Sequence, residues 1–255
     1  MTGLLRFLEH HALLYRRTWK GSMFVSFISP LLFLGAMGFG LGSLISRGPV
    51  GTVDGVTYVA FLGPGLLAAT TMQTAYVEAT YPILAKIQWL RTYDGMLATP
   101  LTIGNVVSGE LTWMAFRLMM AAVTFFIVMV LFGLIHSPLA ALAILVAIVN
   151  GLAFGAPILA FTATQHTDSA FSVIGRFLIT PLFLLGGAFF PIHQLPKLLQ
   201  DLAWLTPLAH AVTLARGLTT GHVASSAAID MLVLLGYAAI GLVAATITMR
   251  RRLSK

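Results

Sequence analysis

The hydrophobic positions of this chain fall into long runs without Asp, Glu, Lys or Arg. The five longest uncharged runs contain 26, 23, 50, 20 and 19 residues. Because a helix needs about 20 apolar residues to cross a bilayer, each run can hold at least one span. The 50-residue run is too long for one helix, and Gly133, Ser137 and Pro138 form a break near its middle. The pattern predicts an all-α polytopic membrane protein with six transmembrane helices.

We expect all of these helices to form one transmembrane domain over residues 1–255. The expected transmembrane helices are 21–46, 57–80, 107–134, 139–164, 172–190 and 229–249. An even number of spans places both termini on the same side of the membrane. Residues 1–20 put apolar side chains such as Phe7 and Trp19 opposite basic ones at helical spacing, which predicts an amphipathic interfacial helix. It serves either as a simple basic anchor or as a gate.

The segment between the second and third expected spans is too polar to cross a bilayer. Its residues Ile87, Leu90, Tyr93 and Leu97 follow a helical stripe that Pro100 ends. We therefore expect an amphipathic helix over residues 86–101. Its apolar side suits a groove on another protein, or else it packs against its own bundle.

The segment between the fifth and sixth expected spans, residues 191–218, contains three prolines that divide it into two short helical pieces. Neither piece is long enough to cross. Leu198, Leu199, Leu202 and Leu205 lie on one helical face, as expected for helices that enter the outer leaflet and return. We expect an outer re-entrant hairpin here.

Composition supports the membrane assignment. The chain is 58% hydrophobic and 9% charged, whereas soluble domains carry about 25% charged residues, and its mean hydropathy is +0.92. The net charge of +7 follows the membrane topology, because eleven of the fifteen basic residues flank the spans on one side. By the positive-inside rule we expect both termini in the cytoplasm and no nucleic-acid partner. The chain contains no cysteine, which excludes thiol catalysis and cysteine-ligated metals.

Motifs for chemistry are missing from the sequence. It contains no GxxxxGK[ST] phosphate loop, no HExxH zinc motif and no GxSxG nucleophile motif. We expect no catalytic residue, metal or cofactor in this chain, so any nucleotide energy must come from a partner. Glu78, Glu110 and Arg117 are ionisable groups near spans, and we expect them to fix helix packing at the cytoplasmic interface. Phe189 and Phe190 are either lid residues or ordinary interface aromatics.

Two blocks of sequence resemble a known family. The segment from Leu182 to Leu218, which includes LFLLGGAFFP and PLAHAVTLARGL, resembles the signature of type-2 ABC exporter permeases. The segment from Tyr58 to Trp113, which includes LRTYDGMLATPLT, is similar to nodulation-factor exporter and daunorubicin-type multidrug-efflux permeases. The resemblance covers essentially the whole chain.

The resemblance implies a half-transporter in a bacterial plasma (inner) membrane. A second, identical permease chain would complete the pathway, and two copies of a separate ABC ATPase would bind ATP and Mg. Carried over by position, the ATPase-coupling residues are Leu90, Arg91, Thr92, Tyr93, Asp94, Met96, Leu97 and Pro100. The outer-gate residues are Phe189, Phe190, Pro191, Pro196, Leu199 and Trp204, and the gate helix is the amphipathic segment near Leu4 to Trp19.

The predicted activity is ATP-driven export of an amphipathic drug, lipid or glycolipid, as in antibiotic resistance by efflux. Residues expected to line the cavity are Phe27, Phe33, Met72, Gln73, Tyr76 and Phe183. One alternative is an ion-gradient-driven secondary transporter, which would need intramembrane acids or histidines. Another is a scaffold that anchors an ATPase without transporting anything.

Overall fold

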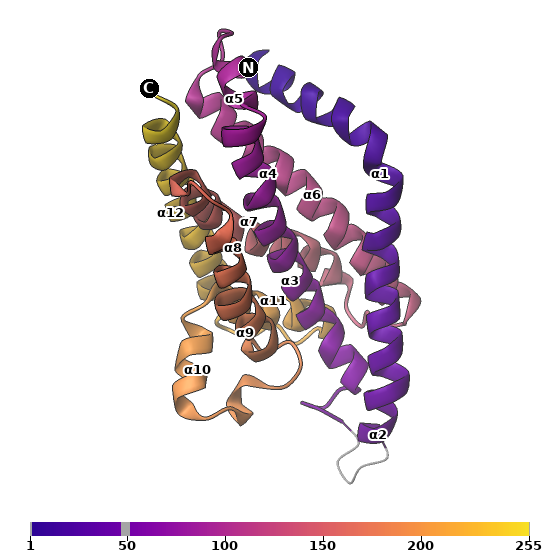
Figure 1. Ribbon diagram of the computed structural model, residues 1–255. Helices are drawn as coiled ribbons and strands as arrows, with labels where there is room; N and C mark the ends of the chain where they lie inside the picture. Colours follow the sequence, from indigo (N-terminus) through magenta and orange to yellow (C-terminus); the bar gives the residue numbers. More distant parts are fainter. Residues whose placement is uncertain (1, 47–51, 255) are drawn as a thin grey trace.

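The computed structural model describes residues 2–46 and 52–254, and within them the chain is helical (Figure 1). The described residues contain no strand, only an isolated bridge between Val53 and Val56. This confirms the all-helical class that the uncharged runs predict.

The first half of the bundle comprises α1 (Thr2–Met37), the π-helix η1 (Gly38–Gly42), α2 (Ser43–Ser46), α3 (Tyr58–Ala79), α4 (Tyr81–Leu84), the π-helix η2 (Ala85–Trp89), α5 (Thr92–Leu97) and α6 (Ile103–Leu131). The second half comprises η3 (Pro138–Ala141), α7 (Leu142–Thr164), α8 (Ser169–Ile174), the π-helix η4 (Gly175–Ile179), α9 (Thr180–Leu185), η5 (Ile192–Gln194), α10 (Lys197–Trp204), α11 (Pro207–Thr220) and α12 (Ala227–Leu253).

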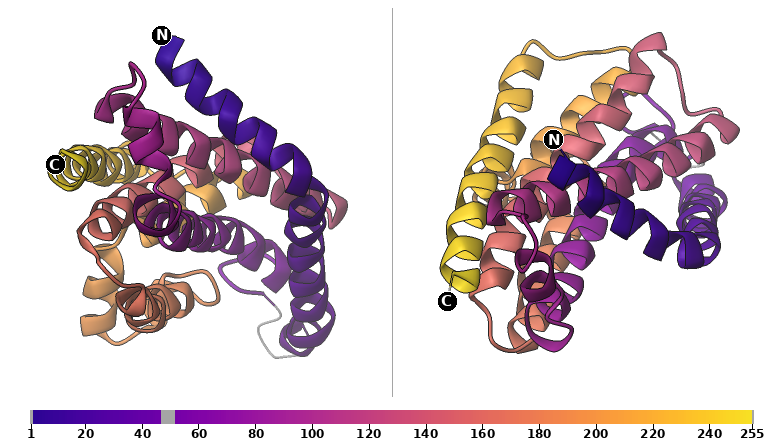
Figure 2. Two further views of the ribbon diagram at one scale, coloured as in Figure 1. Left: turned by 45° about the horizontal axis from the view of Figure 1, so that its top comes forward. Right: turned by 90° about the horizontal axis from the view of Figure 1, so that it is seen from above.

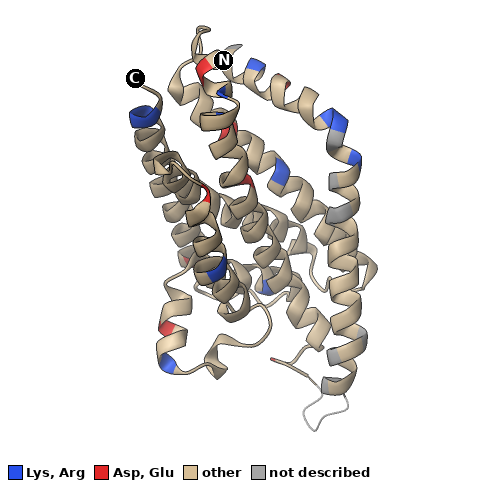
Figure 3. Cartoon of the chain, viewed as in Figure 1, with Lys and Arg blue, Asp and Glu red and all other residues tan. Residues whose placement is uncertain are grey.

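Three described helices are long and apolar enough to cross a membrane, namely Ile103–Leu131, Pro138–Thr164 and Ala227–Leu253. They correspond to the expected third, fourth and sixth spans. Gly133 adopts a φ of +67° after α6, and the Ser137 hydroxyl accepts a hydrogen bond from the Leu139 amide where the next helix begins. Figure 3 shows long stretches of these helices without charged residues.

Helix α7 lies at the centre of the bundle and packs against α3, α6, α11 and α12 (Figure 2). Its contact with α12 is close because Gly241 has no Cβ: an added Cβ would lie 2.6 Å from the backbone nitrogen of Pro157. Small residues at such crossings let apolar helices approach without a gap. The core around α7 is apolar, and the amide of Asn150 within it donates to the Ala68 carbonyl of α3.

The N-terminal region differs in detail from the expected division at residue 20. Helix α1 is continuous from Thr2 to Met37, because no proline or turn sequence separates the expected interfacial helix from the first span. The helix bends along its length, so that its first part crosses over α6 and the remainder runs down the side of the bundle (Figure 1).

The fifth expected span also ends earlier than the sequence pattern suggests. Helix is continuous from Ser169 to Leu185 rather than to residue 190. The chain turns at Gly187, which adopts a φ of +84° that side chains with a Cβ rarely accept. This turn directs Phe189 and Phe190 back toward the bundle instead of extending the helix.

Candidate functional site

The segment that joins α3 to α6 lies at the end of the molecule that also holds both termini (Figure 1). It is not one helix over residues 86–101. The helical turn that ends at Leu90 is separated from α5 by Arg91, which has a left-handed φ of +47°. A left-handed residue commonly ends a helix because it turns the chain away from the helix axis. The expected coupling helix is therefore two short pieces.

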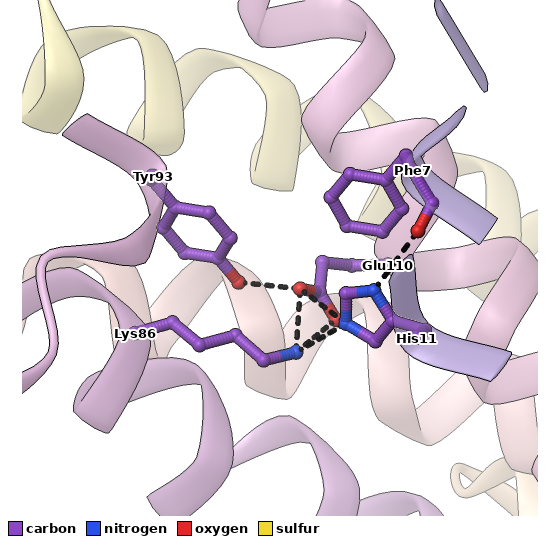
Figure 4. A network of polar contacts seen from close by, with 5 residues as sticks. All are labelled: Phe7, His11, Lys86, Tyr93 and Glu110. Atoms are coloured by element: carbon purple, nitrogen blue, oxygen red, sulfur yellow. Dashed lines mark hydrogen bonds and ion pairs between the residues drawn. The ribbon is translucent and has the colours of Figure 1, made fainter. Parts of the chain in front are cut away.

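A buried polar cluster connects this segment to the rest of the bundle (Figure 4). The Lys86 ammonium donates to both carboxylate oxygens of Glu110, at 2.6 and 2.8 Å. The Tyr93 hydroxyl donates to the same carboxylate at 2.8 Å. His11 Nε2 lies 2.9 Å from Lys86 Nζ and 3.4 Å from Glu110 Oε1. The cluster thus joins α1, η2, α5 and α6.

The contacts of His11 favour one tautomer of its ring. Its Nδ1 lies 3.2 Å from the Phe7 carbonyl oxygen, which can only accept, so this contact suits a hydrogen on Nδ1. Nε2 is then free to accept from Lys86. The ring also stacks on Phe7, at 4.5 Å between centroids. His11 therefore fixes the first part of α1 to the Lys86–Glu110 pair.

Burial makes the cluster sensitive to the loss of any member. Glu110 is 3% exposed and Tyr93 is fully buried. A buried carboxylate is costly unless cations and hydrogen-bond donors surround it. Burial and the adjacent Glu110 charge together raise the pKa of Tyr93 well above its usual value. Its hydroxyl therefore stays protonated and remains a donor at physiological pH.

A second ion pair lies between the long helices. Arg117 Nε of α6 donates to Glu78 of α3 at 2.9 Å, and the Arg117 guanidinium lies over the Tyr15 ring of α1 at 4.8 Å. Glu78, Glu110 and Arg117 therefore each contact a different helix from their own.

The coupling residues differ in their surroundings. Trp89 and Leu90 are exposed, at 61% and 70%, next to the buried cluster. Tyr93 faces inward, whereas Asp94 faces outward. Arg91 and Pro100 are also exposed, and Thr92, Met96 and Leu97 are partly buried. The segment thus has an internal anchor and an exposed apolar surface, made of Trp89 and Leu90, at the same end of the molecule.

The six expected cavity residues have different surroundings in the described part of the chain. Met72 is fully buried in the core, and the Tyr76 hydroxyl donates to the Phe171 carbonyl at 2.7 Å. Phe27 packs against the core. Gln73 lines a groove of about 510 Å³ together with polar side chains of α3 and α6, including Glu78 and Arg117. The sequence does not show which face of α3 is buried, because that helix is apolar almost all round.

Phe33 and Phe183 contact the expected outer gate instead. Their rings lie 6.0 and 5.2 Å from that of Phe189, between centroids. Pro191 is buried, Phe190 and Leu199 are partly buried, and Pro196 is exposed. Trp204 packs edge-on against His210, which bonds to Asp230 at 2.7 Å. The outer-gate residues therefore form two separate groups of contacts.

Sequence reasoning missed two residues that organise the buried cluster, His11 and Lys86. Lys86 counted only as a charge that flanks the spans, and His11 only as a histidine without a partner at zinc-motif spacing. A usable signal was present for Lys86, because a cation among the apolar positions of a candidate docking helix needs a nearby acid. Nothing local in the sequence distinguishes His11 from His10.

Comparison with known proteins identifies the family. The model of the family described as "ABC-2 type transporter" matches residues 6–220. The chain is 33% identical over 241 residues to nodulation protein J of Rhizobium leguminosarum bv. viciae. The aligned region covers 93% of this chain and 91% of that protein. It is 35% identical over 202 residues to nodulation protein J of Sinorhizobium fredii, covering 78% and 75% of the two chains.

A more distant relative comes from a bacterium of another group. The inner membrane transport permease YadH of Escherichia coli is 24% identical over 205 residues, covering 78% of this chain and 75% of that protein. The family model's match, residues 6–220, begins within α1 and extends to the end of α11. It therefore contains the expected coupling segment, the buried cluster and the expected outer gate. Together with the long apolar helices, these matches show that the chain belongs to the ABC-2 type transporter family.

Proposed function

We propose that this protein is the membrane permease of an ATP-driven exporter, and that residues 86–101 receive the motion of a separate ATPase. The observation that carries the proposal is the Glu110 cluster beside the exposed Trp89 and Leu90. A partner protein that binds Trp89 and Leu90 and then moves would displace Lys86 and Tyr93 as well. Through Glu110, that displacement reaches α6, and through His11 it reaches α1.

The proposed topology has six crossing segments. In addition to the three long apolar helices, α1 beyond residue 20, α3, and the helix from α8 to α9 would cross. Both termini then lie in the cytoplasm of a bacterium, beside the coupling segment. The first part of α1 would lie in the interface as a gate helix, and α10 and α11 would form the outer re-entrant hairpin.

The proposed complex contains two ATPase copies, which hold ATP and Mg, and a second, identical permease chain. The substrate is an amphipathic drug, lipid or glycolipid. The groove that contains Gln73 supports this class, because polar side chains such as Gln73 lie in it beside apolar ones such as Val77 and Met120, which suits an amphipathic ligand. ATP-driven closure of the ATPase pair would tilt α1 and α6 and change access to the pathway between the two permeases.

The test is assembly with a candidate ABC ATPase subunit from the same bacterium. We expect Trp89→Ser/Leu90→Ser to abolish copurification of the two proteins, because it removes the apolar surface and leaves the buried cluster intact. Leu198→Ser is the matched control, since Leu198 is 71% exposed but lies on α10, at the other end of the molecule. If the double variant still copurifies with the ATPase, the coupling assignment is wrong.

A proton-gradient collapser separates this proposal from a secondary transporter. At constant ATP, collapse of the gradient leaves an ATP-driven exporter running and stops a gradient-driven one. Export that ceases under these conditions would favour the secondary transporter.

A further inference from the structure

A second polar pocket lies at the end of the molecule opposite the termini, far from the coupling segment. It has a volume of about 600 Å³ and lies between the loop that contains Asp54, the turn η5, and helices α10 and α11. Its lining includes Asp54, His193, Gln200, Arg216 and His222. Nothing in the proposed coupling mechanism uses these residues.

Arg216 brings to this pocket a positive charge that forms no ion pair with another described residue. Its guanidinium lies 3.6 Å from the centre of the Phe61 ring. It donates to the carbonyl oxygens of Phe61, at 3.3 Å, and of Gly187, at 2.8 Å. These are neutral acceptors, and among the described residues no carboxylate forms an ion pair with Arg216. The bonds come from Nε and Nη2, so Nη1 remains available to a ligand.

The pocket offers further donors beside Arg216. The rings of His193 and His222 make no hydrogen bond within the described part of the chain, and both side chains are exposed. The Gln200 amide nitrogen is already occupied, because it donates to the carbonyl oxygens of His193 and Leu195. Gln200 therefore fixes the wall of the pocket, while the two imidazoles remain free to bind.

Asp54 is the one acidic residue among the described residues that line the pocket, and its negative charge would repel an anion. It lies in the exposed loop with a left-handed φ of +49° and is farther than ion-pair distance from Arg216. Its attraction for the guanidinium is therefore the partial, water-screened effect of a charge at the rim. Removing this carboxylate should leave the Arg216 charge more fully exposed to a ligand.

We propose that this pocket binds an oxyanion, a phosphate or carboxylate group, through Arg216 with His193 and His222 as additional donors. A guanidinium suits this ligand because its planar N–H groups match the oxygens of phosphate or carboxylate. The group could be carried by a lipid-like molecule or be dissolved in water. Both present the same oxygens to Arg216.

The test is isothermal titration calorimetry on the purified full chain in an uncharged maltoside detergent. The probes are dihexanoyl phosphatidate, uncharged dihexanoylglycerol, and sodium phosphate as a competitor. We expect phosphatidate to bind and dihexanoylglycerol not to bind. Arg216→Gln and His193→Ala/His222→Ala should each weaken the binding of phosphatidate by about tenfold, because each removes hydrogen-bond donors to the anion.

Asp54→Asn keeps the proposal testable if Arg216→Gln does not fold, because Asp54 makes no ion pair that the fold needs. It should tighten phosphatidate binding severalfold. Competition by sodium phosphate would show that a dissolved oxyanion suffices, and no competition would show that the anion must be carried by a lipid. Equal binding of dihexanoylglycerol, or unchanged affinity in both Asp54→Asn and His193→Ala/His222→Ala, would overturn the proposal.

Discussion

The Glu110 carboxylate accepts hydrogen bonds from Lys86 and Tyr93 at a position that water hardly reaches. Replacing Lys86 with Met would leave this charge buried without its cation. We expect the free energy of unfolding to fall by about 3 kcal/mol, since removing one member of a buried ion pair costs more than removing both. Lys86→Met/Glu110→Met should recover most of that loss, because neither charge remains.

The measurement is the midpoint temperature of unfolding in detergent, monitored by tryptophan fluorescence. Asp94→Asn is the control, because it removes an exposed carboxylate from the same segment. A Lys86→Met midpoint equal to that of the control would show that the cluster contributes nothing.

Tyr93 gives the cluster a defined response to alkaline pH. Its pKa is raised in the folded protein by burial and by the Glu110 charge. The unfolded chain therefore releases the Tyr93 proton near pH 10, while the folded chain keeps it. The contribution of Tyr93 to the free energy of unfolding is thus fully present below about pH 10 and decreases above it. We expect Tyr93→Phe to reduce the slope of stability against pH above about pH 10. Parallel slopes in the two proteins, measured by urea unfolding, would contradict this.

At the scale of elements, the contact between α1 and α6 depends on Gly109. A Cβ at this position would collide with the Phe7 ring, which is 1% exposed. We expect Gly109→Ala to displace the first part of α1 and cost roughly 1–3 kcal/mol, as overpacking does. Trypsin should then cut faster after Arg16 and Arg17.

Gly104→Ala is the matched control for this contact. Gly104 lies in the same helix, and an added Cβ would approach only Thr102 Oγ1, at 3.8 Å. Equal proteolysis of the Gly109→Ala and Gly104→Ala proteins would mean that the Phe7 contact does not hold α1.

The sequence predicts an element correctly where a single local property determines that element. Uncharged length was enough for α6, α7 and α12, and Gly133 with Pro138 was enough for the break between the first two. The division of the coupling segment at Arg91 could not be predicted, because a left-handed arginine has no sequence signature. The His11–Lys86–Glu110 contact was equally hidden, since its members lie 24 and 75 residues apart and meet only after the helices pack.

At the scale of the whole molecule, the two ends have different chemistry. The end with the termini holds the paired Lys86–Glu110 charge and the exposed Trp89 and Leu90. The opposite end holds Arg216 without an ion-pair partner among the described residues. The long helices between these ends carry few charges (Figure 3). Under the proposed function, we expect motion of residues 86–101 to reach the far end through helix packing.

The most direct test of the account is ATP turnover in proteoliposomes by an ABC ATPase that copurifies with this chain. We expect little turnover from either protein alone, a clear increase when both are reconstituted, and loss of that increase with Trp89→Ser/Leu90→Ser. Turnover by the permease alone, or full stimulation by the double variant, would contradict the claim that this chain is a conduit driven from residues 86–101.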